Sequence, residues 1–384
     1  MINFLRKLLK PKYETLNTIK IDAKKILANF NYLNKRQGSA ELFPVLKSNA
    51  YGHGLREMCL ILNKTTAPMV AVDSFPEAQI AWKNFKRKVL ILAEMPLRAY
   101  DYCHLGKTEF VVYNDKTLKH LARYKKRAKI HLFFNSGMNR EGIKDIASFI
   151  SSNKPYLDAV DVVGFCSHLS SAEENSVFNQ EQENKFFQGL MTLREAGYFP
   201  TWIHLGNSAA ALTLENTLLT AYRPGLALYG YDPINGDDDN LKVSYNSQLQ
   251  PALQLFSTIV FIQNLGPDEV VSYNASYRTT QETNIGIIPF GYFEGLDRRL
   301  SNKGEFCVVH PQKNIWVKIA GKVCMNITCL DLGQNDVYKG DQVMIISDQK
   351  NHPNSAHSLA EIMGTIPYEV LVKLQPSIRR EIIW

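Results

Sequence analysis

Polar side chains that could take part in chemistry stand at the ends of short apolar runs between residues 43 and 230. In chain order they are Lys47 with Asn49, Asp73 with Ser74, Glu94, Asn114, Asn135 to Arg140, His168, Asn207 with Ser208, and Arg223. A lysine that closes a buried apolar strand is costly to leave charged without a partner. Such a desolvated lysine suits Schiff-base chemistry, and a salt bridge to a neighbouring acid is the structural alternative.

Eight apolar runs that read as buried strands would position these residues. They are FPVLKS, MVAVDS, KVLILAE, EFVVYN, KIHLFFNS, VVGFCSH, WIHLGNS and YRPGLALYG. Runs of this kind suit parallel strands that are covered on both faces, and the segments between them are long enough for helical crossovers. Residues 23–36 carry apolar side chains at helical spacing, as do Phe187, Leu190 and Met191. Eight strand–helix units in series favour a closed (β/α)8 TIM-type barrel over an open doubly wound sheet.

The pattern changes after about residue 245. Runs such as LQLFSTIVFI, NIGIIPF, EFCVVH, IWVKIA and DQVMIIS follow one another too closely for helical crossovers. This spacing predicts a mostly antiparallel β domain with a short helix around SLAEIMG. The predicted organisation of this α/β protein is an N-terminal extension over 1–16, a barrel over 17–245 and a C-terminal β domain over 246–384.

Composition and charge narrow the classes of protein that fit. The 384 residues are 45% apolar and 21% charged, which is typical of a globular protein and excludes disorder, collagen and coiled coil. The net charge is +7, but residues 1–25 alone carry +5 and leave +2 for the rest. Because the body of the protein is nearly balanced, the sequence does not favour nucleic acid as a partner.

The cysteines and the N-terminus bear on the cellular compartment. Six cysteines are scattered without a CxxC pair, which is typical of reduced thiols in a cytoplasm. Cys324 and Cys329 have neither a second pair nor a nearby histidine, so we expect no metal site. The start MINFLRKLLKPK interleaves apolar and basic residues, unlike a cleaved signal peptide, and no apolar run is long enough to span a membrane. We expect a solvated extension, with weak membrane-surface contact as the alternative.

The segment PVLKSNAYGHG, residues 44–54, is the most specific motif of the chain. It places Lys47 at the end of a strand and Tyr51 four residues later, in a loop that Gly52 and Gly54 loosen. This segment closely resembles the attachment site of pyridoxal 5'-phosphate in the alanine racemase family. The resemblance implies that Lys47 binds the cofactor covalently and acts as one catalytic base, and that Tyr51 contacts the cofactor.

Further segments of the barrel resemble the same family in the same order. They are GMNREG at 137–142, HLSSAEE at 168–174, HLGNSAA at 204–210 and RPGLALYG at 223–230. The resemblance implies that Arg140 contacts both the cofactor and the substrate carboxylate, and that His168 belongs to the polar network beneath the cofactor. Arg223 would face the pyridine nitrogen. The phosphate would be held by Asn207, Ser208, Gly225 and Leu226.

The predicted β domain contains the remaining family motifs. VSYNASY at 271–277 resembles the segment that supplies the second catalytic base, Tyr273, which His168 and Arg223 would help to ionise. In this family the tyrosine comes from the partner subunit, so the resemblance implies a homodimer with shared active sites. The resemblance also extends to the motifs GYFEGL, GKVCMN and IPYEVL. It implies that Tyr292 and Met325 bind the substrate and that Tyr368 lies near the cofactor phosphate.

Several positions depart from the family pattern, including the motif GYFEGL, where GYADGY is more typical. Phe133 stands where many members have a lysine that is carbamylated and pairs with the substrate-binding arginine. No carbamate can form on Phe133, so we expect Asn135 or a small anion to orient Arg140. Asn135 and Asn326 stand where the family usually has aspartate. These changes leave the two predicted bases in place, so we expect activity to persist.

The resemblance implies interconversion of L- and D-alanine in the cytoplasm, which supplies D-alanine for peptidoglycan. A racemase of broader range or with serine preference is the nearest alternative. A non-catalytic pyridoxal-phosphate carrier would share the barrel but lack the β domain that contains Tyr273. A related decarboxylase would use a cysteine acid, for which Cys324 is a poor fit because the adjacent Met325 matches the racemase motif.

Overall fold

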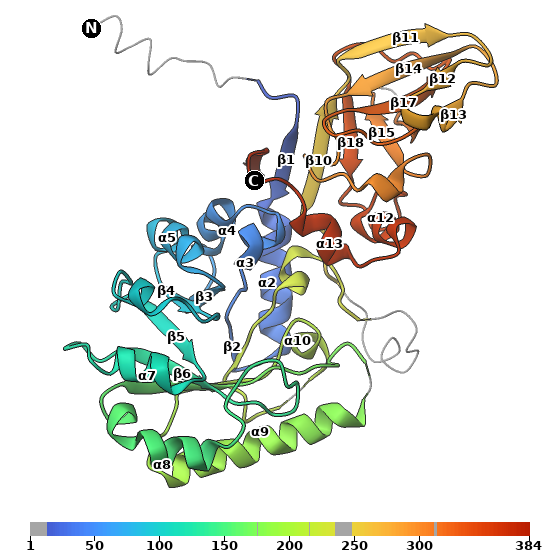
Figure 1. The fold of residues 1–384 in the computed structure, drawn as a ribbon. Helices are drawn as coiled ribbons and strands as arrows, with labels where there is room; N and C mark the ends of the chain where they lie inside the picture. The colour runs from blue at the N-terminus through green and yellow to red at the C-terminus, as the bar shows by residue number, and fades with distance from the viewer. Residues whose placement is uncertain (1–13, 175, 215, 235–247, 311–312) are drawn as a thin grey trace, which may run out of the picture. The chain divides into compact units, whose positions relative to one another are not determined.

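The computed structural model describes residues 14–174, 176–214, 216–234, 248–310 and 313–384 (Figure 1). Contacts divide the chain into two compact units. One unit runs from Asp22 to Ala252, and the other combines the segment up to Ile21 with Leu253–Ile383. The predicted boundary near residue 245 and the acidic segment 236–240 lie outside the described residues, as does most of the predicted extension over 1–16.

The first unit is built on eight parallel strands. They are β2 (Glu41–Leu42), β3 (Met69–Val72), β4 (Lys88–Ile91), β5 (Thr108–Val112), β6 (Lys129–Phe133), β7 (Asp161–Cys166), β8 (Trp202–His204) and β9 (Ala221–Tyr222). Strands β3 to β8 form one sheet in chain order, and β2 pairs with β9. Backbone hydrogen bonds from Ala71 to Pro44 (2.8 Å) and from Thr220 to Ile203 (2.9 Å) join the two sheets into a ring. The prediction of a (β/α)8 barrel is confirmed.

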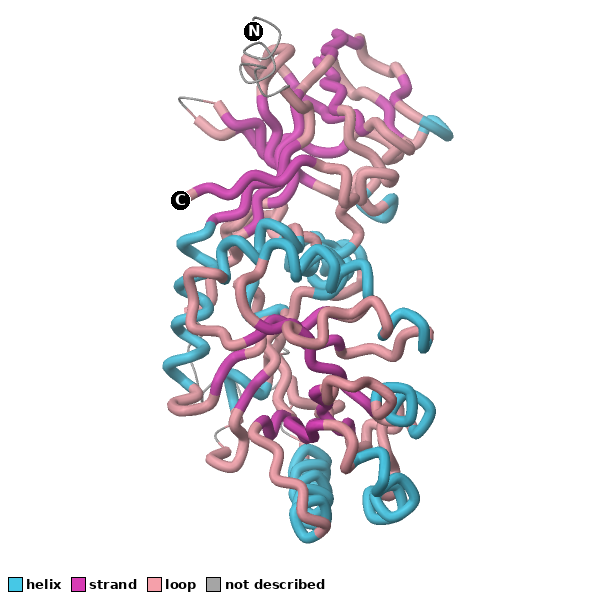
Figure 2. Tube along the Cα trace, turned by 90° about the vertical axis from the view of Figure 1, so that its left-hand side faces the viewer, coloured by secondary structure: helices cyan, strands magenta, loops and turns pink. Residues whose placement is uncertain are grey.

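Helices connect these strands and lie around the outside of them (Figure 2). They are α2 (Ala23–Arg36), α3 (Lys47–Tyr51), α4 (Leu55–Leu62), α5 (Phe75–Asn84), α6 (Leu97–Tyr100), α7 (Asp115–Leu121), α8 (Ile146–Leu157), α9 (Val177–Glu195), α10 (Ala210–Thr213) and the 3-10 turn η1 (Leu226–Tyr229). Side chains cap several of their N-termini; Asp22, for example, accepts hydrogen bonds from the amides of Lys24 and Lys25. Such caps fix where these helices start.

The second unit is built on a nine-stranded, mostly antiparallel sheet, as the sequence predicts. Its order is β11-β14-β17-β16-β15-β18-β10-β1-β19. The strands are β1 (Thr18–Asp22), β10 (Leu253–Thr258), β11 (Phe261–Leu265), β14 (Thr283–Ile288), β15 (Glu305–Val309), β16 (Ile315–Ile319), β17 (Thr328–Gly333), β18 (Gln342–Ile346) and β19 (Arg379–Ile383). The unit also contains the pair β12 (Val270–Val271) and β13 (Tyr277–Arg278), the helices α12 (Ala356–Met363) and α13 (Pro367–Val372), and the 3-10 turns η2 (Tyr273–Ala275) and η3 (Arg298–Leu300).

Residues 18–21 belong to this sheet, whereas the sequence analysis includes them in the barrel. Strand β1 pairs with β10, where Ile19 lies opposite Leu255. Ile19 and Ile21 are both fully buried in this position. Burial of these alternating side chains favours a strand over an early start of the first barrel helix. Among the described residues, no helix is long and apolar enough to cross a membrane.

Candidate active site

Lys47 stands at the start of an unusual turn that follows β2. The next four residues, Ser48 to Tyr51, have φ between 52° and 55°, so the segment is a turn of left-handed helix without glycine. Each such residue costs about 1–2 kcal/mol relative to right-handed backbone. Glu77 helps to hold this turn, because its carboxylate accepts hydrogen bonds from the amides of Ser48 (2.7 Å) and Asp73 (2.9 Å). The turn therefore stores strain directly beside the predicted reactive lysine.

Gly225 and Tyr51 lie close together in the barrel unit. A Cβ atom on Gly225 would lie 2.4 Å from the hydroxyl oxygen of Tyr51, so only glycine allows this approach. Ser208 is buried, and its hydroxyl oxygen accepts hydrogen bonds from the amides of Gly225 (2.8 Å) and Ala227 (3.2 Å). The proton of that hydroxyl can then be donated to an anion. Asn207 accepts from the amide of Ala210, and Leu226 is buried at the start of η1.

The positive charges of three cations act on His168. The pKa of His168 is lowered to about 3 by burial and then by the positive charges of Arg223, Arg140 and Lys47. An Nη atom of Arg223 lies 3.4 Å from Nδ1 of His168. The structure therefore brings together four residues that the sequence analysis selected from the ends of four different strands. A neutral imidazole among cations can accept hydrogen bonds, and the cations can hold an anionic ligand.

Arg140 is oriented by a residue that the sequence analysis did not select. Its Nε and Nη2 atoms donate to the two carboxylate oxygens of Glu141, at 2.5 and 2.7 Å. The expectation that Asn135 orients Arg140 is wrong, and the alternative of a small anion stays a prediction. Asn135 instead accepts from the amides of Gly137 and Asn139 and so shapes the loop. Glu141 supplies a bidentate carboxylate where Phe133 rules out a carbamate.

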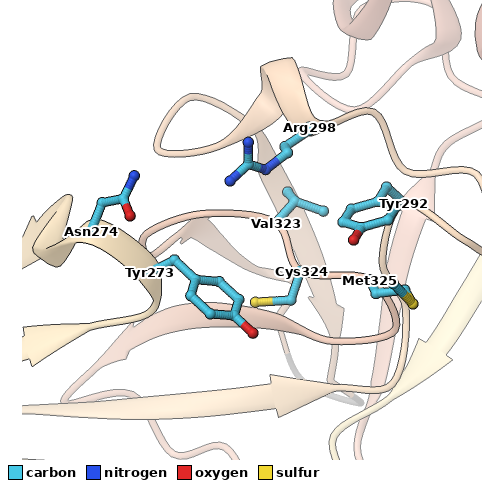
Figure 3. Close-up of a pocket in the computed structure, with 7 residues that line it drawn as sticks. All are labelled: Tyr273, Asn274, Tyr292, Arg298, Val323, Cys324 and Met325. Atoms are coloured by element: carbon cyan, nitrogen blue, oxygen red, sulfur yellow. The ribbon is translucent and has the colours of Figure 1, made fainter.

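The second unit contains a cavity of 450 Å³ that gathers three of the predicted site residues (Figure 3). Its lining consists of Tyr273, Asn274, Tyr292, Arg298, Val323, Cys324 and Met325. The amide of Tyr292 donates to the carbonyl of Cys324 at 3.0 Å, which joins the two loops. Tyr273 is 65% exposed. This unit by itself therefore presents the tyrosine to its surroundings.

Two other predicted positions of this unit lie apart from that lining. Tyr368 is on α13 and does not line the cavity. Asn326 donates from its side-chain amide to Glu294 at 2.8 Å. The cavity also contains Arg298, which the sequence analysis missed. The only signal for it is the pair of arginines that follows the GYFEGL motif.

The sequence analysis also missed buried polar residues inside the barrel. His131 and His204 are fully buried, and Glu109 is 3% exposed. They come from β6, β8 and β5; His131 stands in the middle of β6, and His204 ends β8 but is followed by the apolar Leu205 in the sequence. Among the described residues, no group of histidine, cysteine or acidic side chains could hold a metal ion.

The residues of the barrel unit fit pyridoxal phosphate. The hydroxyl of Ser208 and the close approach at Gly225 suit a phosphate. Arg223 suits the pyridine nitrogen because it is buried as a cation and has no carboxylate partner within ion-pair distance among the described residues. An eight-stranded barrel with a lysine after its first strand, followed along the chain by an antiparallel β domain, defines the class of barrel-type pyridoxal-phosphate enzymes.

Comparison with known proteins agrees with this class. The family profile described as "Alanine racemase, N-terminal domain" matches residues 21–233, and "Alanine racemase, C-terminal domain" matches residues 252–382. A curated alanine racemase of Clostridium perfringens is 30% identical over 374 residues, which cover 94% of this chain and 93% of the relative. This chain belongs to the alanine racemase family.

Solved structures of the family have the same fold. The alanine racemase of Bacillus anthracis with bound L-Ala-P superposes with a TM-score of 0.87 at 27% identity, and the match covers 97% of this chain and 96% of that one. The enzyme of Bartonella henselae, which carries covalently bound pyridoxal phosphate, superposes with a TM-score of 0.82 at 21% identity over 96% of this chain and 100% of that one.

Proposed function

We propose that the protein interconverts L- and D-alanine with pyridoxal phosphate, and that Lys47 and Tyr273 are its two catalytic bases. The observation that carries this proposal is the combined effect of the charges of Lys47, Arg140 and Arg223 on the partly buried, neutral His168. When bound, pyridoxal phosphate would draw electrons from the α-carbon of the amino acid and so weaken its C–H bond. The protein has to supply the attachment point, the binding groups and the bases.

Two bases are needed because racemisation removes the α-proton from one face and returns a proton to the other. Lys47 would attach the cofactor and then exchange the proton on one face. Tyr273 would serve the other face. Its phenol lies in the cavity with Tyr292 and Met325, and its 65% exposure supports a role toward a second molecule of the protein. We therefore propose a homodimer in which each site combines Lys47 of one subunit with Tyr273 of the other.

The cofactor would be held at both of its ends. Ser208, Gly225 and the backbone of Leu226 would bind the phosphate, supported by Asn207, Tyr51 and Tyr368. Arg223 would donate to the pyridine nitrogen. Since an arginine is always protonated, it cannot accept the proton of a pyridinium, so the ring stays largely neutral. A neutral ring limits side reactions because it withdraws electrons less strongly.

The substrate would be recognised through its carboxylate and its small side chain. Arg140, oriented by Glu141, would bind the carboxylate together with the backbone of Met325. Tyr292 would crowd the space for the side chain and so favour a methyl group. A pocket of this kind distinguishes single methylene groups by about 1–3 kcal/mol. Measuring turnover of alanine, serine and lysine tests this proposal, and lysine as the best substrate would contradict it.

The test of the proposed reaction is chiral analysis of L-alanine incubated with the protein and pyridoxal phosphate. D-alanine should accumulate with the unaltered protein and not with Lys47→Ala. Lys83→Ala is a matched control, because Lys83 is an exposed lysine of the same unit on α5. Equal accumulation with Lys47→Ala would overturn the assignment of the attachment lysine.

We also propose that the protein works in the cytoplasm and supplies D-alanine for peptidoglycan. All six cysteines are free thiols, which supports a reducing compartment. Expression of the chain in a bacterium that requires D-alanine for growth tests this role. Growth without added D-alanine is expected from the unaltered chain and not from Lys47→Ala.

A further inference from the structure

Four buried polar residues form a continuous hydrogen-bonded network through the interior of the barrel. Glu109 on β5 lies 2.9 Å from Nε2 of His131 on β6. Nδ1 of His131 lies 2.7 Å from Nε2 of His204 on β8. Nδ1 of His204 in turn contacts Nη1 of Arg223, just after β9. Glu109, His131, His204 and Arg223 are called the buried network below.

The sequence of β7 makes room for this network. Strand β7 lies between β6 and β8, and its residue Gly164 pairs with His131 in register. A Cβ atom on Gly164 would lie 2.0 Å from Nδ1 of His131. The imidazole of His131 therefore passes across Gly164 to reach His204, which no other residue at this position would allow.

Only one arrangement of protons satisfies every contact of the network. Arg223 can only donate, so Nδ1 of His204 must accept and its proton must lie on Nε2. That proton is donated to Nδ1 of His131, whose own Nε2 proton is donated to the carboxylate of Glu109. Both histidines are then neutral, in agreement with the effect of burial, which lowers the pKa of each. The network thus connects a cation at one end with an anion at the other.

Arg223 needs such a partner because it is almost completely buried, at 6% exposure. Its other contacts are backbone carbonyls, including those of Ser167 (2.5 Å) and His204 (2.7 Å), and Nδ1 of the neutral His168 (3.4 Å), and none of them carries a full charge. No carboxylate of the described residues forms an ion pair with it. A buried charge without compensation is strongly destabilising. Glu109, also buried, ends a hydrogen-bonded path from Arg223 to a carboxylate, and the partly exposed Lys88 lies 4.0 Å from its other carboxylate oxygen.

We propose that Glu109 is the counter-ion of Arg223 and a positioning residue for the cofactor site, acting through His131 and His204. The inference rests on the proposed role of Arg223 toward the pyridine nitrogen. Glu109 itself touches neither cofactor nor substrate. Its charge balances the guanidinium, and the two neutral imidazoles between them fix the direction in which the guanidinium donates.

A double-mutant cycle tests whether Glu109 acts through Arg223. Glu109→Gln keeps an oxygen that can accept from His131 and removes the charge. The dissociation constant of pyridoxal phosphate is measured by titration of the cofactor-free protein, for the unaltered chain, Glu109→Gln, Arg223→Gln and the double variant. We expect Glu109→Gln to weaken binding about tenfold when Arg223 is present and less than twofold when position 223 is already glutamine.

Two control variants distinguish an effect that acts through the buried network from a general loss of structure. His131→Phe interrupts the network while both charges stay, and it should weaken binding as Glu109→Gln does. Glu183→Gln removes a half-buried carboxylate of α9 that bonds to Asn216, outside the network, and should change nothing. Equal weakening by Glu109→Gln in both backgrounds would overturn the proposal, as would no weakening in either.

A second measurement does not depend on the cofactor. Nitrogen-15 NMR of ring-labelled histidines in the cofactor-free protein reports which ring nitrogen of His131 and His204 carries the proton. Neutral rings with the proton on Nε2 support the network, and a doubly protonated ring or an Nδ1 proton on either residue refutes it. If the unaltered protein binds no pyridoxal phosphate, the proposed function fails, while the NMR result still decides the network.

Discussion

Replacing Gly164 by alanine should damage the barrel from its inside. The added methyl carbon would lie 2.0 Å from Nδ1, 2.3 Å from Cγ and 2.7 Å from Cε1 of His131. These distances are far below van der Waals contact, and the neighbouring atoms belong to a fully buried ring. The imidazole must therefore leave its position. It then loses its hydrogen bonds to both Glu109 and His204.

The magnitude follows from these losses. A hydrogen bond to a charged group contributes about 1.5–3 kcal/mol and a neutral one about 0.5–1.5 kcal/mol, and overpacking adds about 1–3 kcal/mol. We expect a loss of about 4 kcal/mol in the free energy of unfolding. For a unit of this size this corresponds to a Tm lower by about 8–16 °C. Thermal unfolding followed by circular dichroism measures the shift.

Two comparisons make the result specific. Gly106→Ala in the same unit is the matched control, because its Cβ would meet only the flexible end of Lys126 at 3.3 Å and the Tm should hardly move. In the double variant Gly164→Ala, His131→Ala the methyl occupies space that the ring has left, so its Tm should equal that of His131→Ala alone. A Tm for Gly164→Ala within 2 °C of the unaltered protein, on the scale that about 1 kcal/mol would produce, would refute the packing argument.

Three further predictions concern charge and backbone strain. The pKa of His168 is about 3 in the folded protein against an ordinary value of 6.5, so below pH 6.5 the unfolded state binds a proton that the folded state does not. The free energy of unfolding should therefore fall with decreasing pH, by up to about 1.4 kcal/mol per pH unit from this residue, and urea titrations of His168→Asn between pH 6 and 4.5 should show a shallower fall. Glu141→Gln should raise KM for alanine about two- to fivefold with kcat nearly unchanged, since the partly exposed pair with Arg140 is worth about 0.5–1 kcal/mol; a fall in kcat alone would contradict this role. Ser48→Gly should stabilise the protein by about 0.5–1 kcal/mol because glycine adopts positive φ without strain, whereas Ser152→Gly in the right-handed helix α8 should destabilise it, and the same urea titrations compare the two.

Much of the fold follows from local pattern, and the exceptions depend on distant partners. The barrel is predictable because its strands are apolar runs at crossover spacing. Strand β1 is not, because its partner β10 lies more than two hundred residues away and nothing local reveals the pairing. On α9 the sequence analysis grouped Phe187, Leu190 and Met191. Leu190 is buried as expected, but Met191 is 52% exposed and the other buried side chains include Phe186 and Leu193. Both faces of the helix carry apolar side chains, and packing against neighbouring elements decides which face is buried.

In the candidate site, too, some residues can be predicted from local sequence pattern and others depend on the three-dimensional structure. The rule that chemistry gathers at strand ends found Lys47, Arg140, His168 and Arg223, whose side chains the structure brings together; their roles remain predictions. That rule did not find His131, which stands inside β6, or His204, which ends β8 but lies within the apolar run WIHL of the sequence. Nor could it find Glu141, because an acidic residue that directly follows an arginine in the sequence is ordinarily interpreted as an exposed, solvated residue. The orientation of a guanidinium is a three-dimensional property that spacing does not encode.

The left-handed turn after Lys47 has a consequence for motion. From the sequence alone this segment, which Gly52 and Gly54 follow, is expected to be a flexible loop. Its four non-glycine residues at φ near +53° occupy a small, isolated region of backbone space, so each has few neighbouring conformations to visit. The backbone beside the lysine should therefore be stiff on the picosecond-to-nanosecond timescale, with NMR order parameters near those of the barrel strands. Lys47 would then sample positions through its own side-chain torsions, on an anchor that hardly moves.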